Sequence, residues 1–226
     1  MTTIGLIGAG MIGGTVARLA VAAGYDVVLS NSRGPETLTD LVKELGPNAR
    51  AATPPEAAEA GDLVVATIPL KAYRSLPAEQ TAGKPVIDTN NYYPSRDGQL
   101  PELADGSTSS SQMLQRHLSS AQVVKCFNNI YFKHLQALAR PAGSPDRTAL
   151  PIAGDDPRAK AAVTEFLDAI GYDAVDAGPL AAGGLFQPGT PLYGTIYAGD
   201  DADFATSPGV PASADAVRRA LAAADG

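Results

Sequence analysis

Residues 4–14 read IGLIGAGMIGG, a short apolar strand that runs directly into a G-x-G-x-x-G turn. In this motif Gly8 permits a sharp turn, Gly10 lets the backbone approach a pyrophosphate, and Gly13 allows the following helix to pack closely on the sheet. The N–H groups at the start of that helix attract an anion. The stretch therefore predicts a dinucleotide-binding fold. We expect cofactor contacts from Gly8, Gly10, Met11, Ile12 and Gly13.

The segment after the next predicted strand, Asp26–Ser30, indicates which dinucleotide binds. About 20 residues beyond the glycines, an NAD-binding chain usually carries Asp or Glu, which binds the ribose hydroxyl. This chain has Asn31, Ser32 and Arg33 there. A hydroxyl and a guanidinium can hydrogen-bond a 2′-phosphate, which a carboxylate would repel. The three residues favour NADP(H); the alternative is a solvated turn before the helix that opens at Pro35.

The 226-residue chain has 45% hydrophobic and 18% charged residues and a net charge of −7, which suits a globular protein of one domain, with or without a small appendage. The negative charge gives no electrostatic footprint for nucleic acid. Without a basic leader or an apolar run as long as a membrane span, we expect a cytoplasmic protein with no membrane partner. The single cysteine, Cys126, is expected to be a buried, inert thiol, and two histidines predict no metal site.

Apolar stretches typical of buried parallel strands alternate with helical patterns along the first 140 residues. Beyond the opening strand, further strands are predicted at 26–30, 62–68, 85–88 and 121–127, and helices at 11–23, 36–45, 55–60, 109–118 and 130–138. This alternation predicts an α/β fold with a Rossmann-type, doubly wound parallel sheet. Ligands of such sheets bind beyond the carboxyl ends of the strands. The residues at those ends are Gly8, Ser30, Ile68, Asn90 and Asn128.

Beyond a loop at residues 140–146, the sequence predicts a small C-terminal α/β lobe and an irregular tail. We assign residues 1–140 to an NADP-binding Rossmann domain and residues 141–226 to the lobe and tail, the region of the second substrate and of a dimer interface. Glycine and proline interrupt regular structure in the segment Phe186–Tyr197, yet the segment is too apolar to remain in water. We expect it to dock over the second-substrate site.

Five short motifs stand out along residues 4–182: IGAGMIG at 7–13, SR at 32–33, VVKCFN at 123–128, LPIAGDD at 150–156 and VDAGPL at 175–180. Together they resemble the F420H2:NADP oxidoreductase family and its relatives, the cytosolic reductase domains of the STEAP ferric reductases. The resemblance implies a homodimer that passes hydride between NADP(H) and a deazaflavin (F420) or flavin ring. The chain departs from the family at residues 185–194, which are irregular where the second ring is expected.

Candidate contacts to the nicotinamide lie at the ends of the predicted strands. Ile68, Pro69 and Leu70 can form an apolar wall beside the ring, and Asn90 or Asn128 can bond its carboxamide; the alternative for each Asn is ordinary loop chemistry. Hydride transfer between two rings needs close approach more than an acid–base pair, so we identify no catalytic residue. Several aromatic side chains can line a planar-ring pocket or belong to the core: Tyr92, Tyr93, Tyr131, Phe132, Phe186 and Tyr193.

Two ionisable side chains leave alternatives open. Lys125 can act as a general acid when desolvated, although a salt-bridged lysine is the simpler interpretation, and His134 can protonate a reduced ring or merely pack. The sequence favours an oxidoreductase that transfers hydride between NADP(H) and F420 or a flavin. An NADPH-dependent reductase of a small carbonyl or imine and a non-catalytic NADP(H)-sensing protein remain alternatives, and the second substrate is not identified.

Overall fold

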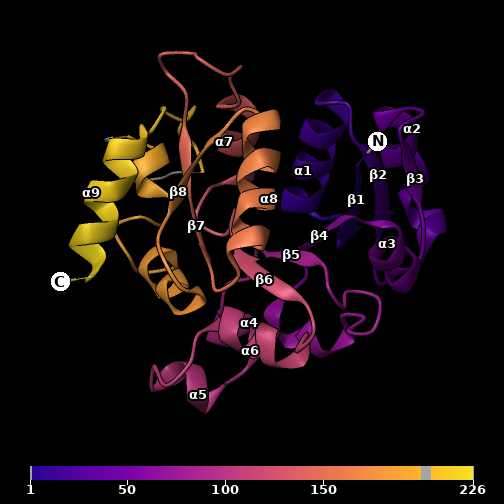
Figure 1. Ribbon diagram of the computed structural model, residues 1–226, viewed down its shortest axis with the longest axis horizontal. Coiled ribbons are helices and arrows are strands. Elements are labelled where there is room, and N and C mark those ends of the chain that lie inside the picture. The colour runs from indigo at the N-terminus through magenta and orange to yellow at the C-terminus, as the bar shows by residue number, and fades with distance from the viewer. Residues whose placement is uncertain (1, 200–204, 226) are drawn as a thin grey trace.

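The computed structural model describes residues 2–199 and 205–225, which form an eight-stranded sheet with helices on both faces (Figure 1). The strand order is β3-β2-β1-β4-β5-β6-β7-β8, and its first six strands have the order typical of dinucleotide-binding folds. The predicted Rossmann-type α/β fold is therefore confirmed. The strands are β1 (Thr3–Ile7), β2 (Asp26–Ser30), β3 (Ala49–Ala51), β4 (Leu63–Ala66), β5 (Pro85–Asp88), β6 (Gln122–Lys125), β7 (Ala149–Gly154) and β8 (Asp173–Asp176).

The strands from both predicted parts of the chain belong to the same sheet. All neighbours from β3 to β6 pair in parallel. β7 then pairs antiparallel with β6, with Lys125 opposite Ala153, and β8 pairs in parallel with β7. The region after residue 140 thus extends the sheet at its edge, as the orange strands in Figure 1 show. A domain boundary at residue 140 stays a prediction.

Helices cover the sheet and differ in detail from those predicted. The expected helix 36–45 is a 3-10 helix followed by an α-helix, the expected helix 130–138 begins two residues later, and two one-turn helices precede α6. No helix within the described ranges is long and apolar enough to cross a membrane. The α-helices are α1 (Met11–Ala22), α2 (Thr39–Leu45), α3 (Pro54–Ala60), α4 (Pro94–Asp97), α5 (Pro101–Ala104), α6 (Ser110–His117), α7 (Phe132–Ala137), α8 (Pro157–Ala169) and α9 (Ala214–Asp225). The 3-10 helices are η1 (Pro35–Leu38), η2 (Leu70–Ser75), η3 (Leu180–Phe186) and η4 (Thr195–Tyr197).

Both faces of the central strands are buried, because successive side chains of a strand point to opposite faces. Leu6 of β1 and Val65 of β4 belong to a large apolar cluster with residues of α1, α7 and α8. Ile7 and Val64 belong to a second cluster with residues of α3 and α6. The sheet is therefore packed between two layers of helices, and the loops at its carboxyl edge are fixed where they leave the strands.

The irregular tail docks on its own chain. Phe186, Leu192 and Tyr197 are fully buried in the larger cluster. The amide of Asn129 donates to Leu192 O at 3.0 Å, and the hydroxyl of Tyr197 donates to Ala149 O at 3.1 Å. The expectation that this apolar segment must dock is confirmed, and its large apolar side chains are covered within the chain itself.

Candidate functional site at the carboxyl edge of the sheet

The glycine turn between β1 and α1 leaves no room for side chains at two of its positions. Gly8 has a φ of +106°, and a Cβ there would lie 2.4 Å from Thr67 O. At Gly13 a Cβ would lie 2.1 Å from Gly8 O. Thr67, just after β4, locks the turn by donating its hydroxyl to Gly8 O. These two glycines are therefore required by the turn and by the contact between helix and sheet, as predicted.

Gly10 differs, because a Cβ added there would have no atom of the described residues within 4 Å. It is the N-cap of α1, and within that part of the chain no side chain caps the helix there. The first N–H groups of this 12-residue helix thus begin beside open space at the sheet edge. A side chain at Gly10 would fill that space. Residues and geometry here fit the pyrophosphate of a dinucleotide.

The loop after β2 presents the predicted phosphate-binding side chains. Asn31 shapes the loop, because its Oδ1 accepts from the N–H of Arg33 at 2.8 Å and its Nδ2 donates to Thr37 at 2.8 Å. Ser32 and Arg33 are exposed. Within the described ranges, no ion pair engages the Arg33 guanidinium. Asn31 is thus committed to the loop, while Ser32 and Arg33 remain available for a phosphate.

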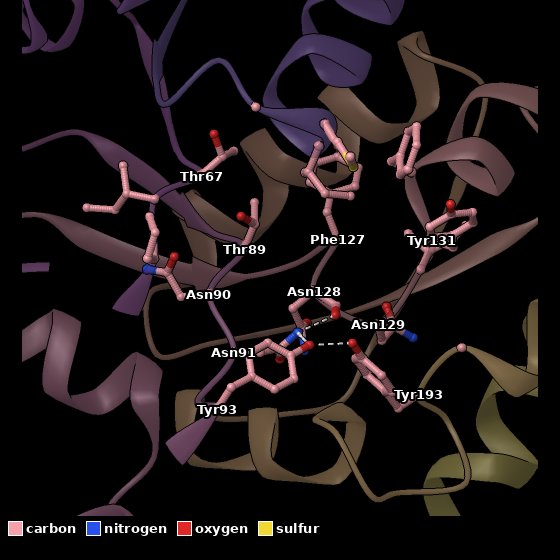
Figure 2. A pocket seen from close by; sticks show the side chains of 18 of the residues that line it. Thr67, Thr89, Asn90, Asn91, Tyr93, Phe127, Asn128, Asn129, Tyr131 and Tyr193 are labelled. Carbon is pink, nitrogen blue, oxygen red and sulfur yellow. Dashed lines mark hydrogen bonds between the residues drawn. The ribbon is translucent and has the colours of Figure 1, made fainter. Parts of the chain in front are cut away.

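A cavity of about 460 Å³ opens at the carboxyl ends of β1, β4, β5 and β6 (Figure 2). This is the crevice where ligands bind in doubly wound sheets. Leu70 is fully buried and does not line it, so the apolar wall consists of Ile68 and Pro69. The fold brings these predicted site residues together in the lining of the cavity: Gly10, Met11, Ile12, Ile68, Pro69, Asn90 and Asn128.

Several residues that line the cavity were not predicted from the sequence to contact a ligand. Asn91 and Asn129 directly follow Asn90 and Asn128, which were predicted as contacts. The occurrence of two consecutive asparagines at each of two strand ends could have indicated all four residues. Thr67 lies within the predicted strand 62–68, whose apolar sequence gives no sign of a ligand contact. Arg96, in α4, gave no signal in the sequence because that one-turn helix has no hydrophobic period.

The chain turns sharply at the end of β6 to bring two amides to the cavity. Phe127 is fully buried and has a φ of 63°, in the left-handed region that non-glycine residues rarely adopt. The amide nitrogen of Asn128 donates to Asn91 Oδ1 at 3.1 Å and to Phe186 O at 2.9 Å. Only the side-chain oxygen of Asn128 is therefore left to meet a carboxamide, and it has no partner within the described structure.

Two tyrosines connect opposite rims of the cavity. The hydroxyls of Tyr93, after β5, and Tyr193, in the tail, are hydrogen-bonded to each other (Figure 2). The guanidinium of Arg96 lies 4.8 Å from the centroid of the Tyr93 ring. Burial raises the pKa of Tyr193, and the hydrogen bond to Tyr93 raises it further. Tyr193 therefore stays protonated near neutral pH, and the pair presents phenol groups to the cavity.

The ionisable side chains that line the cavity are Arg96, Tyr93, Tyr131 and Tyr193. His134 is fully buried, is hydrogen-bonded through Nε2 to Ser207 O, and does not line the cavity. Cys126 is likewise fully buried, and burial raises the pKa of its thiol, as expected for an inert cysteine. Within residues 2–199 and 205–225, no group of His, Cys, Asp and Glu is arranged to hold a metal.

Comparison with known proteins identifies the chain's relatives. Residues 3–92, which contain the glycine turn and the loop after β2, match the family model described as NADP oxidoreductase, coenzyme F420-dependent. Metalloreductase STEAP3 of Rattus norvegicus is 30% identical over 181 residues, which are 79% of this chain and 34% of that protein. Both matches show that the chain is similar to this NADP oxidoreductase family. It spans about a third of the length of the STEAP3 relative.

Two solved structures of similar proteins share the fold of this chain. A hypothetical protein from Sinorhizobium meliloti is 28% identical, with a TM-score of 0.74, and the match covers 85% of this chain and 93% of that one. A proposed F420-dependent NADP reductase from Arthrobacter sp. FB24 is 26% identical, with a TM-score of 0.68, and the match covers 80% and 86% of the two chains. Family and fold together support an NADP-dependent oxidoreductase that binds NADP(H).

Proposed function

We propose that this protein transfers hydride between NADP(H) and a deazaflavin ring such as F420, or a flavin ring. The observation that carries the proposal is the cavity itself. It adjoins the uncapped start of α1, and among the described residues no carboxylate, histidine or lysine lines it. A site for ring-to-ring hydride transfer needs shape and close approach and no acid–base pair. The family and the name of the Arthrobacter relative support the same acceptor class.

Several of the predicted site residues take a role in this proposal. Gly10 and the start of α1 hold the pyrophosphate, Ser32 and Arg33 hold the 2′-phosphate, and Ile68 with Pro69 forms the wall beside the nicotinamide. Asn90 bonds the carboxamide of that ring. When bound, the dinucleotide supplies the hydride chemistry, and the protein supplies binding, orientation and exclusion of water.

The tail closes the cavity in this scheme. Tyr193 and Gly194 line it, and Gly194 N–H donates to Asn129 O at 2.9 Å, so the tail is fastened to the loop after β6. A second ring would lie between this tail and the nicotinamide wall. The cytoplasmic location, the homodimer and the division at residue 140 stay predictions.

A second candidate, a reductase of small carbonyl or imine compounds, is favoured by one observation. The hydrogen-bonded hydroxyls of Tyr93 and Tyr193 lie in the lining of the cavity. A phenol pair of this kind can hold a carbonyl oxygen or an imine nitrogen by hydrogen bonding, and such contacts stabilise negative charge that develops there. In the F420 or flavin case, the same pair would bond a ring heteroatom.

The test measures binding first and turnover second. The purified protein is titrated with NADPH, NADH and 2′,5′-ADP, and oxidation of NADPH is then followed with F420, FMN and a panel of small ketones and cyclic imines. Turnover with F420 or FMN supports the proposal, and turnover with ketones or imines alone transfers the function to the second candidate. Tight NADPH binding with no turnover on any acceptor would contradict both and favour a sensing protein.

A further inference from the structure

A buried pair of opposite charges lies beside the cavity without lining it. Lys125, at the end of β6, has 1% of its side chain exposed, and Asp88, at the end of β5, has none exposed. Their charged atoms, Nζ and Oδ2, lie 3.8 Å apart. Burial lowers the pKa of the Lys125 ammonium, and the Asp88 carboxylate opposes that shift. Two charges are costly to bury, and apolar side chains of similar size often serve stability as well.

The pair engages one residue of the site from both sides. Asp88 Oδ1 accepts from the N–H of Asn90 at 2.8 Å, and Lys125 Nζ donates to Asn90 O at 2.8 Å. Two serines at the start of α6 complete the network. Ser111 donates to Asp88 Oδ2 at 2.6 Å, and Lys125 Nζ donates to Ser110 and Ser111 at 3.2 and 3.1 Å. The backbone of Asn90 is thus held by a charge at its N–H and by another at its carbonyl.

The side chain of Asn90 has the opposite character. It is 3% exposed, it lines the cavity, and neither its oxygen nor its nitrogen has a hydrogen-bond partner in the described structure. An unpaired buried amide costs free energy that a ligand's own donor and acceptor can recover. The structure therefore combines a firmly held backbone with an amide that still needs a partner.

We infer that Lys125 and Asp88 are positioning residues, which hold Asn90 so that its amide meets the carboxamide of the bound nicotinamide. The inference rests on the proposed function and answers the open question about Lys125. Lys125 does not line the cavity, so it does not touch the reacting atoms. The 3-10 helix η3 packs closely on Lys125 as well, since a Cβ at Gly183 would lie 2.5 Å from the Cδ of Lys125.

The experiment is a double-mutant cycle with affinity as its readout. The dissociation constants of NADPH and of 2′,5′-ADP, which lacks the nicotinamide, are measured for the wild type, Lys125→Met, Asn90→Ala and the double variant. We expect each single substitution to weaken NADPH binding about tenfold, or about 1.4 kcal/mol, and to leave 2′,5′-ADP binding unchanged. Because Lys125 acts through the Asn90 side chain, the double variant should be no weaker than Asn90→Ala alone.

Two further variants keep the outcome interpretable. Lys84→Met is the matched control, because Lys84 Nζ also donates to three backbone carbonyls, those of Ala58, Glu59 and Gly61, but away from the cavity. It should lower thermal stability without changing NADPH affinity. If Lys125→Met does not fold, Asp88→Asn combined with Lys125→Met removes both charges and leaves neither unpaired.

Additive losses of NADPH affinity in the cycle, or equal losses for 2′,5′-ADP, would overturn the inference and leave the pair with a structural role alone. An Asn90→Ala variant that binds NADPH normally would also overturn it. The proposed function fails by a different result, which is a wild-type protein that binds neither NADPH nor 2′,5′-ADP.

Discussion

The two halves of the candidate site are built by different means. The phosphate side consists mainly of backbone: the open space at Gly10 and the uncapped start of α1. Two exposed side chains on the loop after β2 complete it. The ring side uses buried amides and phenols that come from the ends of β5 and β6 and from the tail. The phosphate half therefore depends on a local segment, whereas the ring half depends on segments about 100 residues apart, such as Tyr93 and Tyr193.

The largest effect is expected from removing the tail, residues 186–226. A tail that only covered the second-substrate site could be removed without loss of NADPH affinity. This tail does more, because Phe186, Leu192 and Tyr197 are fully buried in the main core. Losing one such side chain typically costs about 2–5 kcal/mol, so the truncated chain should not fold cooperatively. Circular dichroism during heating measures this, and a cooperative transition near that of the full chain would show that the tail is dispensable for the core.

Gly10→Val should affect the phosphate side alone. The added side chain enters open space beside α1, so the fold should survive while NADPH affinity falls at least about 100-fold, or about 2.7 kcal/mol. Gly13→Val is the matched variant, and it should destabilise the fold because its Cβ would lie 2.1 Å from Gly8 O. Titration calorimetry and thermal melts separate the two results. Retained NADPH affinity in a folded Gly10→Val protein would contradict the placement of the pyrophosphate.

Arg33→Ala should weaken NADPH far more than NADH. The exposed guanidinium can make a charge-assisted contact that only the 2′-phosphate offers, and such a contact contributes about 1.5–3 kcal/mol. Dissociation constants for both dinucleotides give the comparison, with Lys43→Ala as a control cation in the next helix. If both dinucleotides weaken equally, Arg33 stacks or supports the loop and does not select phosphate.

The smallest expected effect is a loss of stability at alkaline pH. Burial raises the pKa values of Tyr172 and Tyr197 above their ordinary value of about 10. The unfolded chain therefore loses these phenolic protons first, so the contribution of the two tyrosines to stability should be constant below about pH 10 and fall above it, by up to about 1.4 kcal/mol per pH unit for each tyrosine. Urea unfolding at several pH values measures the slope. Tyr197→Phe should flatten it, and an unchanged slope would exclude Tyr197 as a source.

Ionisation of Tyr197 should affect the two halves of the site differently. Tyr197 accepts from the amide of Asn129 at 3.3 Å, so its ionisation would disturb a residue that lines the cavity. The phosphate side has no buried tyrosine contact of this kind among the residues that form the glycine turn. NADPH affinity should therefore decline at alkaline pH, when the ring side is disturbed, while 2′,5′-ADP affinity should persist to higher pH.

Sequence alone determined the elements whose signals are local. The glycines at 8, 10 and 13 specify the turn, and continuous apolar runs specify the buried strands, because chain geometry and burial act over a few residues. The same signals located Ile68, Asn90 and Asn128 near one sheet edge, since parallel strands end together. The three-residue strand β3 and the one-turn helices α4 and α5 were missed because they are too short to show a hydrophobic period.

The tertiary structure alone decided which side chains face a ligand and which are committed elsewhere. It turned Asn31 inward to its own loop, buried Leu70 away from the cavity, and placed Arg96 in the cavity lining. It also brought Lys125 next to Asp88 and Tyr193 next to Tyr93. These contacts join segments far apart in the chain, and they depend on the order of the strands in the sheet and on the docking of the tail, which no local pattern of residues encodes.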